Sequence, residues 1–188
     1  MADYDLIIRG GQVVFPDDTF TADIGVKAGK ITAIAKPGAL DGSDKIIEAD
    51  GLTVLAGIID PHVHMRDPGS NDREDFMTGT MSAAAGGVTT VLDHPNTVPP
   101  VNNVNNLKDK RDLLTTRAYV DFGLYGAAGA GNLDLIKDLA EAGVVAFKTF
   151  LHGAPEGREA EFVGLCATDD GELYSVLSAI SKTGLMSI

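Results

Sequence analysis

The sequence lacks several features that mark particular classes of protein. Cys166 is its only cysteine, so the chain cannot form an internal disulfide, as is usual in a reducing compartment. No apolar run approaches the length needed to span a membrane, and the N-terminus has neither the basic nor the apolar segment of a signal peptide. These absences predict a soluble cytoplasmic protein with no membrane partner.

Basic residues are also scarce. The 188 residues include 15 Lys and Arg against 27 Asp and Glu, giving a net charge of −12, and the basic residues form no cluster. Because binding to nucleic acid needs a basic surface, this composition argues against a nucleic-acid partner. The overall field would also repel an anionic substrate, so attraction for one has to come from a local arginine or a bound metal.

The first 53 residues predict a small β module. Short β-branched runs occur at residues 6–8, 13–15, 23–26, 31–34 and 46–47. Between them lie residue pairs typical of turns, at residues 10–11, 28–29 and 37–38.

From residue 54 to residue 188 the pattern changes to alternating strands and helices. The expected strands cover residues 53–60, 88–93, 118–124 and 144–150, and the expected helices cover residues 73–85, 103–115, 132–142 and 170–183. Asn132 and Asp169 are expected to cap the last two helices. The alternation predicts an α/β fold built from about four parallel βα units, and residues 185–188 resemble the start of a fifth strand.

Two histidines lie at the end of the first of these strands. Side chains two positions apart on a strand point to the same side, so His62 and His64 can present two imidazoles to one metal ion. Pro61 and the Pro68–Gly69 pair predict where the strand gives way to a loop. The strand itself is expected to be buried, because it follows an apolar run: Leu52, Val54, Leu55, Ile58 and Ile59.

Lys148 lies in the apolar segment of residues 143–150. Burial lowers the pKa of a lysine and so favours the neutral amine. A neutral amine can react with carbon dioxide to give a carbamate, which can bridge two cations. The alternative is a lysine that extends to solvent from the end of its strand.

The segment from Gly57 to Gly69, with Asp60 before the histidine pair and Arg66 and Pro68–Gly69 after it, resembles the signature of the amidohydrolase superfamily. The resemblance is to its cyclic-amidase branch of dihydroorotases, allantoinases and hydantoinases. It implies a metal-dependent TIM (β/α)₈ barrel beside a β-sandwich. Residues 1–53 would then be part of the sandwich, and residues 54–188 the first half of the barrel.

The resemblance also implies the chemistry. Two zinc ions share a bridging hydroxide, His62 and His64 bind the more buried ion, and carboxylated Lys148 bridges both. The family's two further histidines and its proton-shuttle aspartate are expected beyond residue 188, so no catalytic residue is assigned within the chain. A chain that ends after four of eight units is expected to be the N-terminal portion of a longer enzyme, with little activity alone; the alternative is a complete four-unit open-sheet domain.

Arg66 and Asn96 match the two positions that hold the substrate carboxylate in dihydroorotases, the second within Pro95-Asn96-Thr97-Val98-Pro99-Pro100. A guanidinium binds a carboxylate through two parallel hydrogen bonds, and an amide adds a donor. The expected substrate is therefore dihydroorotate, an intermediate of pyrimidine biosynthesis, with allantoin or a hydantoin as alternatives. The competing interpretation pairs Arg66 with Asp67 or Asp72.

Two other histidines are not expected to bind the metal. His94 is interpreted as a loop residue near the site rather than a ligand, and His152 as an exposed loop histidine. A full-length enzyme of this type would be a homodimer or homotetramer. The alternative of another class is an amidohydrolase-fold protein without catalysis that acts through assembly.

Overall fold

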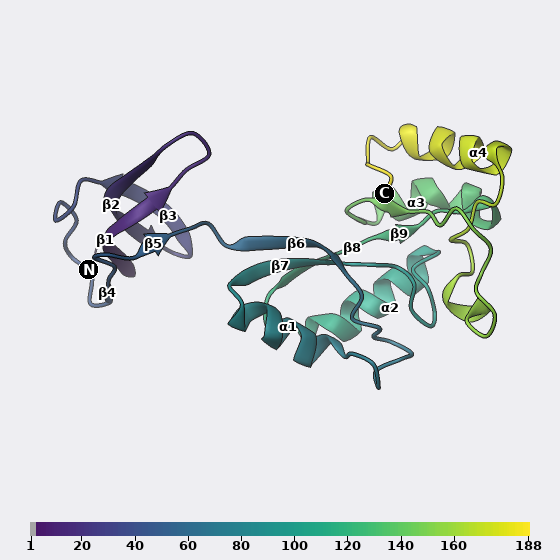
Figure 1. The fold of residues 1–188 in the computed structure, drawn as a ribbon, viewed down its shortest axis with the longest axis horizontal. Coiled ribbons are helices and arrows are strands. Elements are labelled where there is room, and N and C mark those ends of the chain that lie inside the picture. The colour runs from purple at the N-terminus through teal and green to yellow at the C-terminus, as the bar shows by residue number, and fades with distance from the viewer. Residues whose placement is uncertain (1–2) are drawn as a thin grey trace. The chain divides into compact units, whose positions relative to one another are not determined.

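The structure, a computed structural model, describes residues 3–188, which divide into two compact units between Ala56 and Gly57. The first unit consists of β-strands, and the second alternates strands with helices (Figure 1). Each unit has its own cluster of buried apolar residues. Within residues 3–188, no helix has the length and apolar character needed to cross a membrane.

The first unit is one five-stranded sheet. The strands β3, β2, β1 and β4 lie side by side in that order, and β5 also pairs with β1. The pairs β1–β2 and β2–β3 are antiparallel, whereas β4 and β5 run parallel to β1. The strands are β1 (Leu6–Val14), β2 (Thr19–Lys27), β3 (Lys30–Ala35), β4 (Ile46–Glu48) and β5 (Thr53–Val54).

The expected turn at Gly10–Gly11 is wrong, because β1 runs through both glycines as one strand. The pairing with β2 shifts register between Ile8 and Gly11, and Gly10 has φ +71°, so the glycines form a bulge. The buried carboxylate of Asp23 holds this bulge: Oδ1 accepts from the Gly10 N–H at 2.9 Å, and Oδ2 accepts from the Gly38 N–H at 2.8 Å. One side chain therefore connects the bulge to the turn after β3.

The second unit has the predicted alternation of strands and helices. Its strands are β6 (Ile58–Val63), β7 (Val88–Asp93), β8 (Asp121–Leu124), β9 (Gly126–Ala127) and β10 (Phe147–Lys148). Its α-helices are α1 (Phe76–Ala85), α2 (Val104–Thr115), α3 (Ile136–Glu141) and α4 (Asp170–Ser181), and its 3₁₀ helices are η1 (Ala130–Leu135) and η2 (Glu159–Glu161).

The strands of this unit are parallel and follow one another across the sheet in sequence order. β6, β7 and β8 form one parallel group, and β9 pairs in parallel with β10. The Val145 N–H donates to the Leu124 carbonyl at 3.0 Å, which continues the pairing between the two groups. Ser187 forms a parallel bridge with Phe147, as expected for a strand that starts near residue 185. The described residues form an open sheet, with no closed barrel.

Side chains from the strands and helices of the second unit build one apolar core. Helix α2 contributes two residues spaced seven apart, Leu107 and Leu114, and α4 contributes Val176 and Ile180 at i, i+4 spacing. The strands bring Val91 and Phe147 to the same cluster. This core fixes the strand ends that carry the candidate site.

The prediction of a buried first strand is wrong. Leu52, Leu55, Ile58 and Ile59 are exposed, and the strand that carries the histidines begins only at Ile58. For Ile58 and Ile59 the reason is position: β6 is an edge strand that pairs with β7 alone among the described strands. The strand also continues through Pro61, where its pairing with β7 shifts register between Asp60 and Val63, as proline at a bulge permits.

Two further local predictions differ from the structure. Asn132 does not cap a helix: it lies within η1 at non-helical φ and ψ, and its Oδ1 accepts from the Gly129 N–H at 2.9 Å. The strand expected over residues 144–150 is assigned only at Phe147–Lys148. The prediction for Asp169 is confirmed, since its carboxylate caps α4 by accepting from the Glu172 N–H at 2.9 Å.

Candidate metal centre

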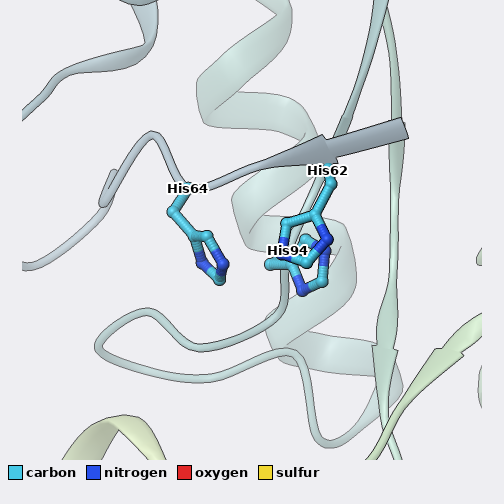
Figure 2. Close-up of side chains that lie close together, drawn as sticks. All are labelled: His62, His64 and His94. Carbon is cyan, nitrogen blue, oxygen red and sulfur yellow. The ribbon is translucent and has the colours of Figure 1, made fainter. Parts of the chain in front are cut away.

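Three imidazoles meet at the C-terminal ends of β6 and β7. His62 lies in β6, His64 follows its end, and His94 follows the end of β7. The parallel pairing brings Val63 opposite Asp93, and the His94 N–H donates to the Val63 carbonyl at 3.0 Å. One ring nitrogen from each histidine lies within 4.8 Å of the others (Figure 2). Imidazole nitrogens grouped in this way suit zinc and similar divalent metals.

His64 is oriented by Asn96. Its Nδ1 lies 2.9 Å from the Asn96 Oδ1, and because an amide oxygen only accepts, Nδ1 carries the proton in this pair. The Nε2 lone pair is then free for a metal, the usual arrangement of a metal-binding histidine. Burial, with the charge of Arg66 as the next cause, lowers the pKa of His64 and favours the neutral ring.

His94 joins the cluster, although the sequence analysis did not expect it to bind the metal. Its side chain is buried, and burial together with the neighbouring histidines lowers its pKa to about 3. The ring is therefore neutral at physiological pH. A sequence signal for it does exist: a histidine directly after strand 88–93 must lie beside the end of the neighbouring parallel strand.

A buried ion pair holds the histidine segments together. Lys110, on α2, places Nζ 2.7 Å from the Asp93 Oδ2 and 3.1 Å from the His94 carbonyl oxygen. The Asp93 Oδ1 accepts from the Met65 N–H at 3.0 Å. Lys110 and Asp93 thus connect the loop after β6 to the loop after β7, and both side chains are almost fully buried.

Lys148 ends β10 and is half-buried. Because β10 pairs in parallel with β9, and β6, β7 and β8 are also parallel, the C-terminal end of β10 lies at the same edge of the sheet as the ends of β6 and β7. The Lys148 Nζ lies 4.9 Å from the centre of the Phe150 ring, in a cation–π contact. The lysine is therefore on the same edge of the sheet as the three imidazoles.

Arg66 pairs with Glu161, not with Asp67 or Asp72. Its Nη1 lies 3.2 Å from the Glu161 Oε2, and Arg158 binds the same carboxylate. Two guanidinium groups therefore share the Glu161 carboxylate. Arg66 itself has φ +55°, a left-handed conformation that is rare outside glycine and is often found at functional sites.

Three other residues named from the sequence are not members of the histidine cluster. Asp67 is buried and pairs with Arg117. His152 is exposed, as predicted, with Nδ1 2.6 Å from the Gly153 carbonyl oxygen. Cys166 is a free, partly buried thiol, and burial raises its pKa.

The fold and the site define an α/β protein with a cluster of three histidines, able to hold a metal ion, at the carboxyl ends of parallel strands. Residues 53–183 match the amidohydrolase family, so the chain belongs to that family. It is 38% identical to an allantoinase of Deinococcus radiodurans over 187 residues and 38% identical to a dihydroorotase of Methanosarcina acetivorans over 183 residues. Each alignment covers 97% of this chain, but 39% and 38% of the respective relative.

A solved structure has the same fold. The L-hydantoinase (dihydropyrimidinase) of Arthrobacter aurescens superposes with a TM-score of 0.89 at 33% identity, over 98% of this chain and 40% of that enzyme. The chain therefore spans about two fifths of the length of the relatives that it matches.

Proposed function

We propose that the protein containing this chain is a zinc-dependent hydrolase of cyclic amides. His62 and His64 would bind one ion, and carboxylated Lys148 would bridge it to a second. Zinc supplies a Lewis acid and, by lowering the pKa of bound water toward neutrality, a nucleophile for ring opening. The observation that carries the proposal is the cluster of imidazoles at the C-terminal ends of β6 and β7, and the parallel pairing of β10 supports a place for Lys148 at the same edge of the sheet. In this account residues 57–188 are the first half of a (β/α)₈ barrel, and the full-length enzyme is a homo-oligomer.

The chain's own residues would prepare this site before substrate binds. Asn96 holds His64 with Nε2 directed away from the amide, because Nδ1 makes the hydrogen bond. The Lys110–Asp93 pair fixes the loops that carry His64 and His94. Ligands held in place in this way lose less conformational freedom when a metal binds.

For the substrate we propose dihydroorotate. Arg66 would bind its carboxylate, helped by Asn96, whose amide nitrogen is not used by His64. In the structure the Arg66 guanidinium pairs with Glu161, so a substrate carboxylate would have to take the place of Glu161 or share the guanidinium with it. Allantoin and hydantoins remain the alternatives, since the allantoinase and dihydroorotase relatives are equally similar to the chain.

The metal part of the proposal is tested on the full-length protein by zinc analysis, native mass spectrometry and assay of all three cyclic amides. We expect bound zinc, one carbon dioxide added at Lys148, and loss of both the added mass and the activity in Lys148→Ala. Absence of zinc together with an unmodified Lys148 would rule out the enzyme and leave an assembly role.

The substrate part is tested by Arg66→Ala. Hydrogen bonds to a charged group contribute about 1.5 to 3 kcal/mol, so turnover of dihydroorotate should fall at least ten-fold in kcat/KM. Turnover of an uncharged hydantoin should change much less. Equal losses on both substrates would refute carboxylate binding by Arg66.

A further inference from the structure

His94 carries two polar atoms that nothing in the described chain satisfies. Its side chain is 1% exposed, and neither Nδ1 nor Nε2 has a hydrogen-bond partner. A neutral imidazole offers one N–H donor and one lone pair, and buried polar groups in proteins are almost always paired. A buried imidazole without partners is explained if a bound ligand contacts one of its ring nitrogens.

The polar groups around the His94 ring are used elsewhere. The Tyr125 ring lies 4.8 Å from it, but the Tyr125 hydroxyl donates to the Pro61 carbonyl at 2.8 Å. Lys110 reaches the backbone oxygen of His94, and Asn96 pairs with His64. None of these groups binds a ring nitrogen of His94.

The His94 ring lies next to both of the other imidazoles. Its centre is 4.0 Å from that of His62 and 4.4 Å from that of His64, and Figure 2 shows the His62 and His94 rings overlapping in the view, with the His64 ring beside them. Candidate ligand atoms from all three lie within 4.8 Å of one another. Zinc sites commonly use three protein ligands and leave a fourth position open, and a lone pair on His94 would supply the third.

We propose that His94 is a third imidazole ligand, so that His62, His64 and His94 together bind one zinc-type divalent cation. This inference rests on the metal site of the proposed function and extends it, because that function requires only His62 and His64 from this edge of the sheet. It also explains why a histidine is buried here without a hydrogen-bond partner. Lys148 stays available as the bridging carbamate.

The alternative role for His94 is packing against His62, since their ring planes lie 27° from parallel. Metal affinity alone does not distinguish the two roles, because loss of a residue that only supports a ligand also weakens metal binding about 10- to 100-fold. The number of imidazoles bound to the metal does distinguish them, and X-ray absorption of the zinc-loaded chain reports that number.

The test compares the unaltered chain with His94→Met. Methionine fills the buried volume with an apolar side chain and removes the imidazole. His152→Gln is the matched control, because His152 is the one remaining histidine of the four and is exposed. We expect about three imidazoles per zinc in the unaltered chain and in the control, and about two in His94→Met. The same number in all three proteins would overturn the proposal.

The outcomes also separate this proposal from the proposed function. Two imidazoles per zinc in the unaltered chain would refute His94 as a ligand and leave the His62–His64 site intact, whereas absence of zinc from the full-length protein would refute both. If His94→Met fails to fold, magnetic resonance of isotope-labelled histidine in the unaltered chain replaces it. A zinc-dependent shift at a ring nitrogen of His94 as large as those of His62 and His64 supports ligation, and no shift refutes it.

Discussion

At the scale of single residues, the proposed carboxylate-binding role of Arg66 depends on its partner Glu161. Glu161 occupies the guanidinium of Arg66, and the hydrogen bond from Arg158 is the main cause that lowers the pKa of Glu161. If Arg66 binds substrate as proposed, the substrate carboxylate has to compete with a carboxylate of the chain itself. Because Glu161 lies 95 residues after Arg66, no local pattern in the sequence could reveal this pair.

Glu161→Gln should relieve that competition. The amide cannot form the same charged pair, so an anionic ligand such as N-carbamoyl-aspartate should bind the zinc-loaded chain more tightly, by about ten-fold. Calorimetric titration measures the affinity, with an uncharged hydantoin as the control ligand. Unchanged affinity for the anion would mean that Glu161 and substrate do not share Arg66.

The same pair should make stability depend on pH. Glu161 has its pKa lowered below 4.5 in the folded chain, so its contribution is complete above about pH 4.5 and is lost as the pH falls through the lower folded value. The difference in unfolding free energy between the unaltered chain and Glu161→Gln should be constant from pH 7 to about 5 and shrink below that. A difference that grows as the pH falls would contradict this assignment.

Lys110→Met should be strongly destabilising. It leaves the Asp93 carboxylate buried without its cation, which costs about 3 to 5 kcal/mol. Lys137→Met is the matched control, because the Lys137–Glu141 pair is exposed and 3.7 Å apart, and its loss should change stability by less than about 0.5 kcal/mol. Denaturant unfolding measures both, and equal effects would show that burial of the Lys110–Asp93 pair is not important.

The residues that could be predicted are those with a local signature. The spacing of His62 and His64 predicts two imidazoles on one side of a strand, and both join the cluster. His94 has no such spacing, and its place follows only from the pairing of β6 with β7. Whether Lys148 carries a carbamate and whether Arg66 and Asn96 touch substrate stay predictions.

At the scale of elements, hydrophobic periodicity and capping residues predicted most helices and strands. Asp169 is the N-cap of α4 as expected, and β7 has the predicted bounds. The errors fall where tertiary contacts override local signals. Asn132 has the residue type of a helix cap, but its amide instead bonds to the backbone of residues 102, 127 and 129.

The segment between β9 and η1 has little room for a side chain. A Cβ on Gly129 would lie 2.6 Å from the backbone nitrogen and 2.7 Å from the backbone oxygen of Cys166, so Gly129→Ala must displace the main chain. We expect a loss of about 1 to 3 kcal/mol in unfolding free energy. Gly153→Ala, where no atom lies within 4 Å, should be nearly neutral, and similar values for the two variants would contradict the close contact.

At the scale of the whole molecule, all candidate metal ligands belong to residues 57–188. The βα alternation predicted that parallel strands would bring their carboxyl ends to one edge, and this rule explains why the site assembles from separate loops. What the alternation could not predict is which apolar strand residues are covered. Ile58 and Ile59 are exposed because β6 is an edge strand of the described sheet.

Zinc should therefore stabilise the two units unequally. A ligand that binds only the folded state stabilises it by about 4 kcal/mol at a thousand-fold excess over its Kd. Amide hydrogen exchange should slow in β6, β7 and the loops that follow them, and should be unchanged in β1 to β3. Equal protection of both units would contradict a site confined to the second.

The central claim is that the histidines at the ends of β6 and β7 bind a metal. The most direct measurement is the zinc content of the purified chain after equilibration with zinc and removal of the excess, compared with a His62→Ala/His64→Ala double variant. We predict at least one zinc per unaltered chain and none in the double variant, with circular dichroism confirming that both are folded. Equal zinc in the two proteins, or none in either, would contradict the account.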